Sequence, residues 1–174
     1  ASYYYSQPSI DIAGTIWVDD MPVEVTGQGW LDREWSSQPL ADTQSGWDWM
    51  SLHLSDGSAL MVYQLRHDSG EHYISGSWVS KFGEVIVLKA GDVTMTPMSK
   101  SRLTITGAVG SKEQSGIKEI PLDWRVRAPK LGIDISVTTD RPYSWLATVF
   151  PYWEGPVVAQ GSHQGVGYLE LTGY

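Results

Sequence analysis

The segment WLDREW, residues 30–35, contains two acids and an arginine in consecutive positions between two tryptophans. In an extended strand alternate side chains share a face, so Asp32 and Glu34 point one way and Arg33 the other. The Cα atoms of the two acids would lie roughly 6.5–7 Å apart. Hydrolytic carboxyl pairs are separated by about 5–9.5 Å. Asp32 and Glu34 are therefore the candidate catalytic residues.

The same residues also suit a structural role, because any Asp-x-Glu strand satisfies that spacing. Arg33, and Arg66 further along the chain, could pair with acids across a sheet, as bidentate Arg–carboxylate links often do. Glu154 and Glu170, in the segments YWEG and GYLE, are expected beside the same ion pairs. A structural clasp is the favoured interpretation, followed by polar contacts to a ligand and then by catalysis.

Charged side chains in an aromatic strand need partners, because burying an unpaired charge is costly. Asp32, Arg33 and Glu34 are therefore expected to be largely buried and hydrogen-bonded. Removing Arg33 should then cost about 3–5 kcal/mol of stability, since it leaves a buried carboxylate unpaired. Arg66 is also expected to be paired, which favours binding over proton donation by the acids.

The aromatic residues form a second candidate site. The chain has nine Trp and nine Tyr but only two Phe, and Trp and Tyr suit half-buried surfaces because each ring carries a polar group. Core packing is the favoured interpretation; the alternative is a cavity wall for an apolar or conjugated ligand. The candidate ligand-binding residues are Trp30, Trp35, Trp47, Trp49, Tyr63 and Trp153.

Composition and motifs exclude several other functions. A net charge of −8 argues against nucleic acid and anionic membranes as partners, because both attract basic surfaces. The absence of Cys removes disulfides and thiolate ligands. The four His do not show the spacing of a zinc site, so neither a metal nor a cofactor is predicted. The motifs GxSxG and HExxH are missing, and no motif recommends a Ser nucleophile partnered by a His.

The residues that must be positioned lie in predicted strands. Short alternating segments recur between turn signals, without a helical period, which indicates an antiparallel barrel or sandwich of about ten strands. The clearest hairpin joins GWDWMSLHL to ALMVYQLR through Asp56-Gly57, which supplies the positive φ of a tight turn. Alternation in its first strand places Trp47, Trp49, Ser51 and His53 on one face and Asp48, Met50, Leu52 and Leu54 on the other.

The length of 174 residues fits one domain. No apolar run reaches the length of a transmembrane helix, and the first residues lack a signal-peptide pattern. The chain opens directly into SYYYSQPSIDIAG, a segment with strand character. We therefore expect the chain to be part of a larger protein.

Four segments, GQGWLDREWSSQPL, GWDWMSLHLSDGSALMVYQLR, YWEG and GYLELTGY, resemble the C-terminal half of the hydroxyneurosporene synthase (carotenoid 1,2-hydratase) and AttH-type predicted secreted hydrolase family. The resemblance covers nearly the whole chain. It implies a lipocalin-like antiparallel β-barrel over residues 1–174, an N-terminal lipocalin-like partner domain, and a periplasmic or secreted location. It also implies a large apolar ligand held near the domain junction.

One departure from the family concerns the reaction. Where the hydratases read His-Asp-His-Asn-Trp, residues 31–35 keep only Asp32 and Trp35. A hydratase must protonate an alkene with a positioned acid, and the later segment MVYQLR supplies Tyr63 but no acid. The expected function is binding of an apolar or amphipathic ligand, isoprenoid or lipid-like, together with the N-terminal barrel. The alternatives are an enzyme of the carotenoid-hydratase or Diels–Alderase type that uses Asp32 or Glu34, and a purely structural barrel.

Overall fold

The computed structural model describes residues 2–36, 40–109 and 112–174. The chain divides into two compact units, Ala1–Pro39 and Leu40–Tyr174, each with its own sheet. The described residues form strands joined by turns, and the only helical segment among them is the short 3-10 turn η1 (Pro129–Leu131). The predicted all-β class is confirmed.

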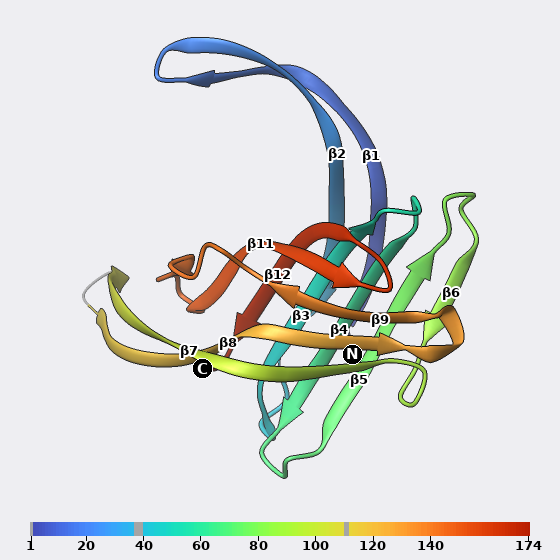
Figure 1. Cartoon of the computed structure of the whole chain (residues 1–174). Coiled ribbons are helices and arrows are strands. Elements are labelled where there is room, and N and C mark those ends of the chain that lie inside the picture. Colours follow the sequence, from blue (N-terminus) through green and yellow to red (C-terminus); the bar gives the residue numbers. More distant parts are fainter. Residues whose placement is uncertain (1, 37–39, 110–111) are drawn as a thin grey trace. The chain divides into compact units, whose positions relative to one another are not determined.

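The first unit is a long antiparallel hairpin of β1 (Ser2–Val18) and β2 (Met21–Ser36) (Figure 1). Asp19 and Asp20 connect the strands and both have positive φ, 48° and 61°. Such a two-residue turn matches the twist of the strands that it joins, and Asp is among the residues that tolerate this conformation. The sequence DD therefore sets the register of the hairpin.

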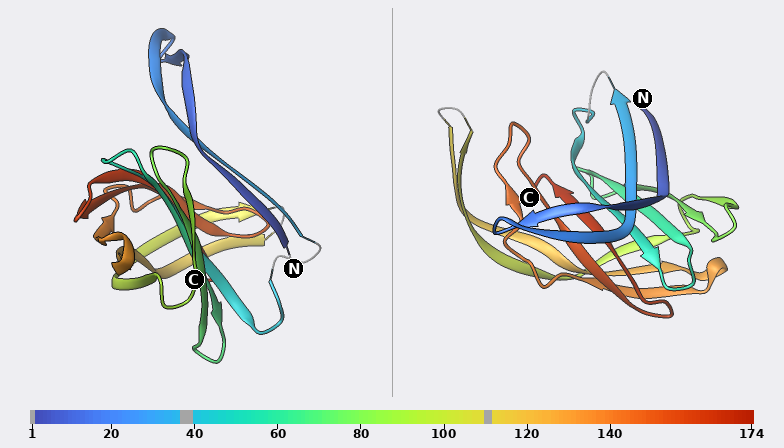
Figure 2. Two further views of the ribbon diagram at one scale, coloured as in Figure 1. Left: turned by 90° about the vertical axis from the view of Figure 1, so that its right-hand side faces the viewer. Right: turned by 90° about the horizontal axis from the view of Figure 1, so that it is seen from above.

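The second unit is an antiparallel sheet of ten strands in which β6 and β7 form the two ends (Figures 1 and 2). The sheet is barrel-like but not closed, and its order is β6-β5-β4-β3-β12-β11-β9-β8-β7, with β10 added beside β11. The predicted number of about ten antiparallel strands is confirmed. The strands are β3 (Gln44–Leu54), β4 (Ala59–His67), β5 (His72–Val79), β6 (Val85–Leu88), β7 (Thr94–Val109), β8 (Lys112–Ala128), β9 (Ile133–Thr138), β10 (Trp145–Leu146), β11 (Tyr152–Gly161) and β12 (Gly165–Thr172).

The predicted hairpin of β3 and β4 is confirmed. Gly57 has a φ of 85° in its turn. The Asp56 carboxylate accepts hydrogen bonds from the backbone N–H of Ser58, at 2.9 Å, and from its hydroxyl, at 2.6 Å. An Asp that binds the backbone two residues ahead is a common way to fix a tight turn.

The inner face of this sheet is filled by apolar side chains. Two large rings, Trp124 and Trp153, are fully buried there, and each indole N–H donates to a backbone carbonyl at 2.7 Å, of Pro121 and Pro142 respectively. Their polar atoms are therefore satisfied inside the core. The other large, fully buried side chains are Met50, Leu52, Leu60, Val62, Val93, Ile120, Ile133, Ile135, Leu169 and Leu171.

Close approach of β12 to β3 depends on Gly167. A Cβ at this position would lie 1.9 Å from the backbone oxygen of Ser51 and 2.8 Å from Leu52 Cδ2. Backbone cannot yield as a flexible side chain can, so we expect Gly167→Ala to lower the free energy of unfolding by about 1–3 kcal/mol or more. Urea denaturation measures this change. The exposed neighbour Val166 is the control, because Val166→Ala should change stability by no more than about 0.5 kcal/mol; equal midpoints for the two variants would contradict the packing described here.

Candidate functional site

Strand β3 presents different chemistry on its two faces. Asp48, Met50 and Leu52 are buried on the inner face, whereas Trp47 and Trp49 are half-buried on the outer face. The alternation predicted from the sequence is confirmed. One strand therefore contributes to two clusters of polar and aromatic side chains, one inside the sheet and one outside it.

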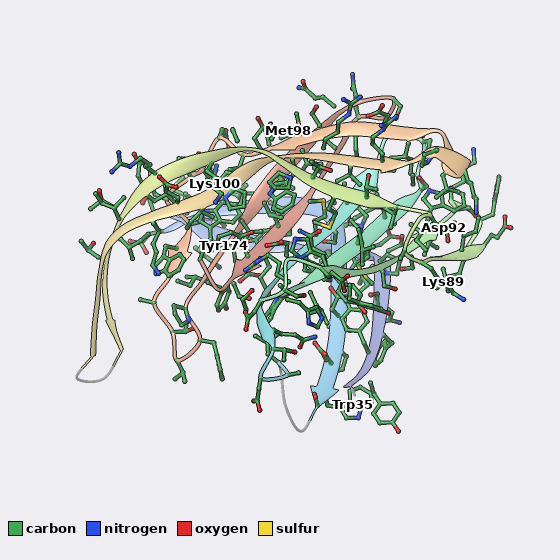
Figure 3. All side chains as sticks on the ribbon, turned by 90° about the horizontal axis from the view of Figure 1, so that it is seen from below. Trp35, Lys89, Asp92, Met98, Lys100 and Tyr174 are labelled. Atoms are coloured by element: carbon green, nitrogen blue, oxygen red, sulfur yellow. The ribbon has the colours of Figure 1, made fainter. Side chains whose placement is uncertain are left out.

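The inner cluster, here called the Asp48 cluster, consists of Asp48, Gln64, Arg66, Thr172 and Tyr174. The Asp48 side chain is 0% exposed. Its carboxylate accepts hydrogen bonds from Gln64 Nε2 at 2.7 Å, from the Tyr174 hydroxyl at 2.8 Å and from Arg66 Nη1. Nη2 of Arg66 donates to the backbone oxygen of Thr172, and the guanidinium carbon lies 4.0 Å from the centre of the Tyr174 ring. Tyr174 is labelled in Figure 3.

Space for this guanidinium is provided by Gly46. A Cβ there would lie 2.5 Å from Arg66 Nη2 and 2.4 Å from the backbone oxygen of Thr172. The cluster thus joins β3, β4 and the end of β12 through a charge that is both buried and fully hydrogen-bonded. Such an arrangement is typical of a structural ion pair.

The outer cluster, here called the aromatic–acid face, consists of Trp47, Trp49, Tyr63, Tyr152, Glu154 and Glu170 from four adjacent strands. Trp49 lies in register between Tyr63 on β4 and Glu170 on β12. The indole N–H of Trp47 donates to Glu170 Oε1 at 2.5 Å. Burial, followed by the charges of Glu154 and Glu170, raises the pKa of the Tyr152 hydroxyl.

Glu154 and Glu170 lie directly opposite each other on β11 and β12. Residues paired in this way have Cβ atoms about 4.5–5.5 Å apart, and like charges in such pairs destabilise a sheet. Trp47 donates a hydrogen bond to Glu170, and the Tyr152 hydroxyl lies close enough to both acids for their charges to raise its pKa. The face therefore combines the apolar area of half-buried rings with the hydrogen-bonding capacity of its polar groups.

The WLDREW strand differs from the expectation of three buried charges. Asp32 is half-buried, and its Oδ1 accepts hydrogen bonds from the hydroxyls of Tyr4 and Ser6, both at 2.5 Å. Arg33 and Glu34 are exposed. The expectation is therefore wrong for these two residues, and with it the cost expected for removing Arg33. The reason is that β2 belongs to a two-stranded sheet, which gives each residue only one cross-strand neighbour.

The six aromatic candidates lie in three environments. Trp30 and Trp35 are on the hairpin, where Trp35 is 54% exposed and stacks on Tyr3 at 6.0 Å between ring centres. Trp47, Trp49 and Tyr63 share the outer face of the main sheet. Trp153 is 0% exposed in the core, so it lies on the opposite side of the sheet from that face.

Sequence reasoning missed the partner of Arg66. The carboxylate that Arg66 binds is Asp48, and Gln64 and Tyr174 complete the cluster. The sequence did contain one sign of this cluster. Asp48 falls on the same face of its strand as the apolar residues Met50 and Leu52. A charge in a core-facing position needs buried partners, but the sequence does not show which residues these are.

Two further properties follow from the described part of the chain. Its residues include no group of three or more His, Asp or Glu placed to hold a metal ion. Within the same residues, no helix has the length and apolar character that crossing a membrane requires.

Comparison with known proteins identifies the family. The chain belongs to the AttH-like family, which matches residues 1–174, so the predicted AttH-type resemblance is confirmed. The fold is similar to the crystal structure of a protein described as an AttH candidate from Nitrosomonas europaea, with 34% identity and a TM-score of 0.81. The match covers 99% of this chain and 52% of the other, so this chain spans about half the length of that relative. A comparison with curated proteins gave no match.

The Asp48 cluster leads to a prediction about stability. Arg66→Ala should lower the free energy of unfolding by about 3–5 kcal/mol, because it leaves the buried Asp48 carboxylate without its counterion. The matched control is Arg125→Ala, which breaks an ion pair with Asp134 in which both side chains are more than 40% exposed. Exposed pairs contribute about 0–1 kcal/mol. Urea unfolding of both variants checks the difference; similar losses would show that the Asp48 pair is not a buried ion pair.

A second prediction concerns alkaline pH. Burial and the charge of Asp48 raise the pKa of the Tyr174 hydroxyl. A group whose pKa is raised by folding contributes stability that is complete below its unfolded pKa, about 10 for Tyr, and is lost as the pH rises above that value. Tyr174→Phe should therefore be less stable than the parent at pH 8, and the gap should narrow above pH ~10. Unfolding free energies across this range measure the gap; a constant gap would contradict the assignment.

Proposed function

We propose that this domain binds an apolar or amphipathic ligand of the isoprenoid or lipid-like class on the aromatic–acid face. The observation that supports this proposal is the row of half-buried rings formed by Trp47, Trp49 and Tyr63, beside the carboxylates of Glu154 and Glu170. Small-molecule sites usually combine apolar and aromatic walls with a few placed polar groups. Rings left half-buried on a sheet provide such walls, because covering them with a ligand removes further apolar area from water.

The core supports placing the ligand on the outer face. The inner face is occupied by fully buried side chains that include Trp124 and Trp153. Protein cores of this kind are close-packed, so a long ligand would have to displace several large side chains to enter. On the outer face, Trp47, Trp49 and Tyr63 are only half-buried.

The polar groups of the face would orient the ligand. Glu170 accepts a hydrogen bond from the indole of Trp47, and the Tyr152 hydroxyl lies near both acids. A ligand hydroxyl directed at the carboxylates would be recognised at the end of an otherwise apolar body. We further propose that an N-terminal lipocalin-like barrel completes the site, in keeping with a Nitrosomonas relative of about twice this length.

Catalysis by the hairpin acids has less support than binding. Asp32 Oδ1 accepts two hydroxyl hydrogen bonds, from Tyr4 and Ser6, which tie this carboxyl group to the neighbouring strand of the hairpin. Glu34 is exposed. A hydratase or cyclase would need one of these acids to be protonated and aimed at the substrate.

Fluorescence titration tests the ligand proposal. All-trans-retinol, a polyene alcohol, is added to the chain and quenching of Trp emission is followed to saturation. Trp49→Ala should weaken binding by about tenfold or more, which corresponds to about 1.4 kcal/mol from one lost ring. The matched control is Phe82→Ala, which removes an exposed ring from the turn between β5 and β6. Retinol should bind this variant as it binds the parent.

Two outcomes would contradict the proposal. One is non-saturable quenching in the parent, which indicates only nonspecific adsorption. The other is an equal affinity of Trp49→Ala and the parent, provided that both melt at similar temperatures. Glu170→Gln supplies a second test, since loss of the carboxylate should weaken binding of retinol more than binding of the corresponding hydrocarbon, which has no hydroxyl to orient.

A further inference from the structure

Two hairpin turns lie side by side at the end of β12 opposite the Asp48 cluster. One joins β3 to β4 and the other joins β11 to β12. The backbone N–H of Ser55 donates to the carbonyl of Gln164 at 2.8 Å, and the N–H of Ser162 donates to the carbonyl of Asp134 on β9 at 3.0 Å. The second turn is therefore held between β9 and the first turn, which gives its side chains fixed neighbours.

These contacts place Ser162, His163 and Asp56 in a row. Ser162 Oγ lies 3.1 Å from His163 Nδ1, and His163 Nε2 lies 3.7 Å from Asp56 Oδ2. Asp56 is itself held by Ser58, which donates two hydrogen bonds to Oδ1 and leaves Oδ2 facing the imidazole. The His163 side chain is 21% exposed.

We propose that Ser162, His163 and Asp56 act as nucleophile, general base and orienting acid in the hydrolysis of a small ester. A Ser hydroxyl next to an imidazole that is in turn oriented by a carboxylate is the arrangement that activates a nucleophile, whatever the fold or chain order. The backbone N–H of Asp134 donates to Ser162 Oγ at 2.8 Å. The hydroxyl hydrogen of Ser162 is thereby left to point at His163 Nδ1.

The carboxylate is suited to its role. Hydrogen bonds from Ser58, together with the nearby His163, lower the pKa of Asp56. An ionised Asp56 favours the tautomer with hydrogen on Nε2, so that Nδ1 is free to accept the proton of Ser162. The 3.7 Å separation is longer than a hydrogen bond, but catalytic contacts are often long before substrate binds.

An open pocket of about 530 Å³ adjoins the nucleophile and includes Ser162 in its lining. Met98, labelled in Figure 3, supplies apolar lining, and Gln160 and Arg125 supply donors. Arg125 makes two hydrogen bonds to Asp134, at 2.8 and 2.9 Å. A guanidinium has five N–H donors, so Arg125 retains others for the carbonyl oxygen of a bound ester. The pocket is more than large enough for a short acyl group.

The reaction balances within these groups. Ser162 Oγ attacks the ester carbonyl carbon while its proton passes to His163 Nδ1. The tetrahedral intermediate breaks its bond to the alcohol oxygen, which takes that proton and leaves as the alcohol. Water then attacks the acyl-Ser162 carbonyl and gives its proton to His163. The carboxylic acid departs as Ser162 recovers its proton, so water is the only co-reactant consumed.

Labelling with a fluorophosphonate, which modifies activated serines, tests the proposal together with hydrolysis of p-nitrophenyl acetate. Mass spectrometry should find one modified residue, Ser162, and Ser162→Ala should abolish labelling and hydrolysis. His163→Gln should slow labelling by about 100-fold or more, the usual contribution of a general base. Ser69→Ala, which removes an exposed hydroxyl from the turn between β4 and β5 and lies outside the pocket lining, is the matched control and should react as the parent does.

Two results of the labelling experiment would contradict the proposal. A parent protein that is not labelled, or Ser162 labelling that is unchanged in His163→Gln, would show that the three residues only join two turns. If Ser162→Ala does not fold, His163→Gln and Asp56→Asn still decide, because both leave the nucleophile in place and both should slow labelling. Retinol binding by these variants should be unchanged, since the turns lie at the other end of β12 from the aromatic–acid face.

Discussion

The buried ion pair between Asp48 and Arg66 constrains much of the main sheet. Isolated charges are strongly disfavoured in a protein interior, so a fully buried carboxylate is retained only where donors surround it. Here the donors come from the second half of β4, through Gln64 and Arg66, and from the C-terminal segment, through Tyr174. Strands β3, β4 and β12 must therefore meet in one register at this end of the core. Gly46 keeps open the space that the guanidinium occupies.

This constraint also determines what the two faces of β3 can do. With Asp48 fixed inward, Met50 and Leu52 enter the core and Trp47 and Trp49 are placed outside. The inner face is then filled, and the outer face combines half-buried rings with the opposed carboxylates of β11 and β12. A sheet of this kind differs from a barrel with a hollow interior, because large side chains fill its inner face.

The two ends of β12 have different chemistry. At its C-terminal end the Asp48 cluster is closed, with each polar group satisfied by a neighbour. At its N-terminal end the turn at Ser162 and His163 is bound by backbone hydrogen bonds to Asp134 and to the β3–β4 turn, which leaves side chains beside an open pocket. Functional residues are often found on loops whose backbone is held by a rigid scaffold while their side chains remain accessible.

The sequence alone determined the strand content, the β3–β4 hairpin at Asp56-Gly57, the two faces of β3 and the AttH-type resemblance. These features depend on local periodicity and turn residues, or on ordered motifs. The tertiary structure decided which groups become partners: Asp48 and Tyr174 are 126 residues apart, and no local pattern relates them. It also left Arg33 and Glu34 exposed, because their strand pairs with a single neighbour. For Trp153 and Glu154, alternation shows only that they face opposite ways; the neighbouring strands determine which side is the core.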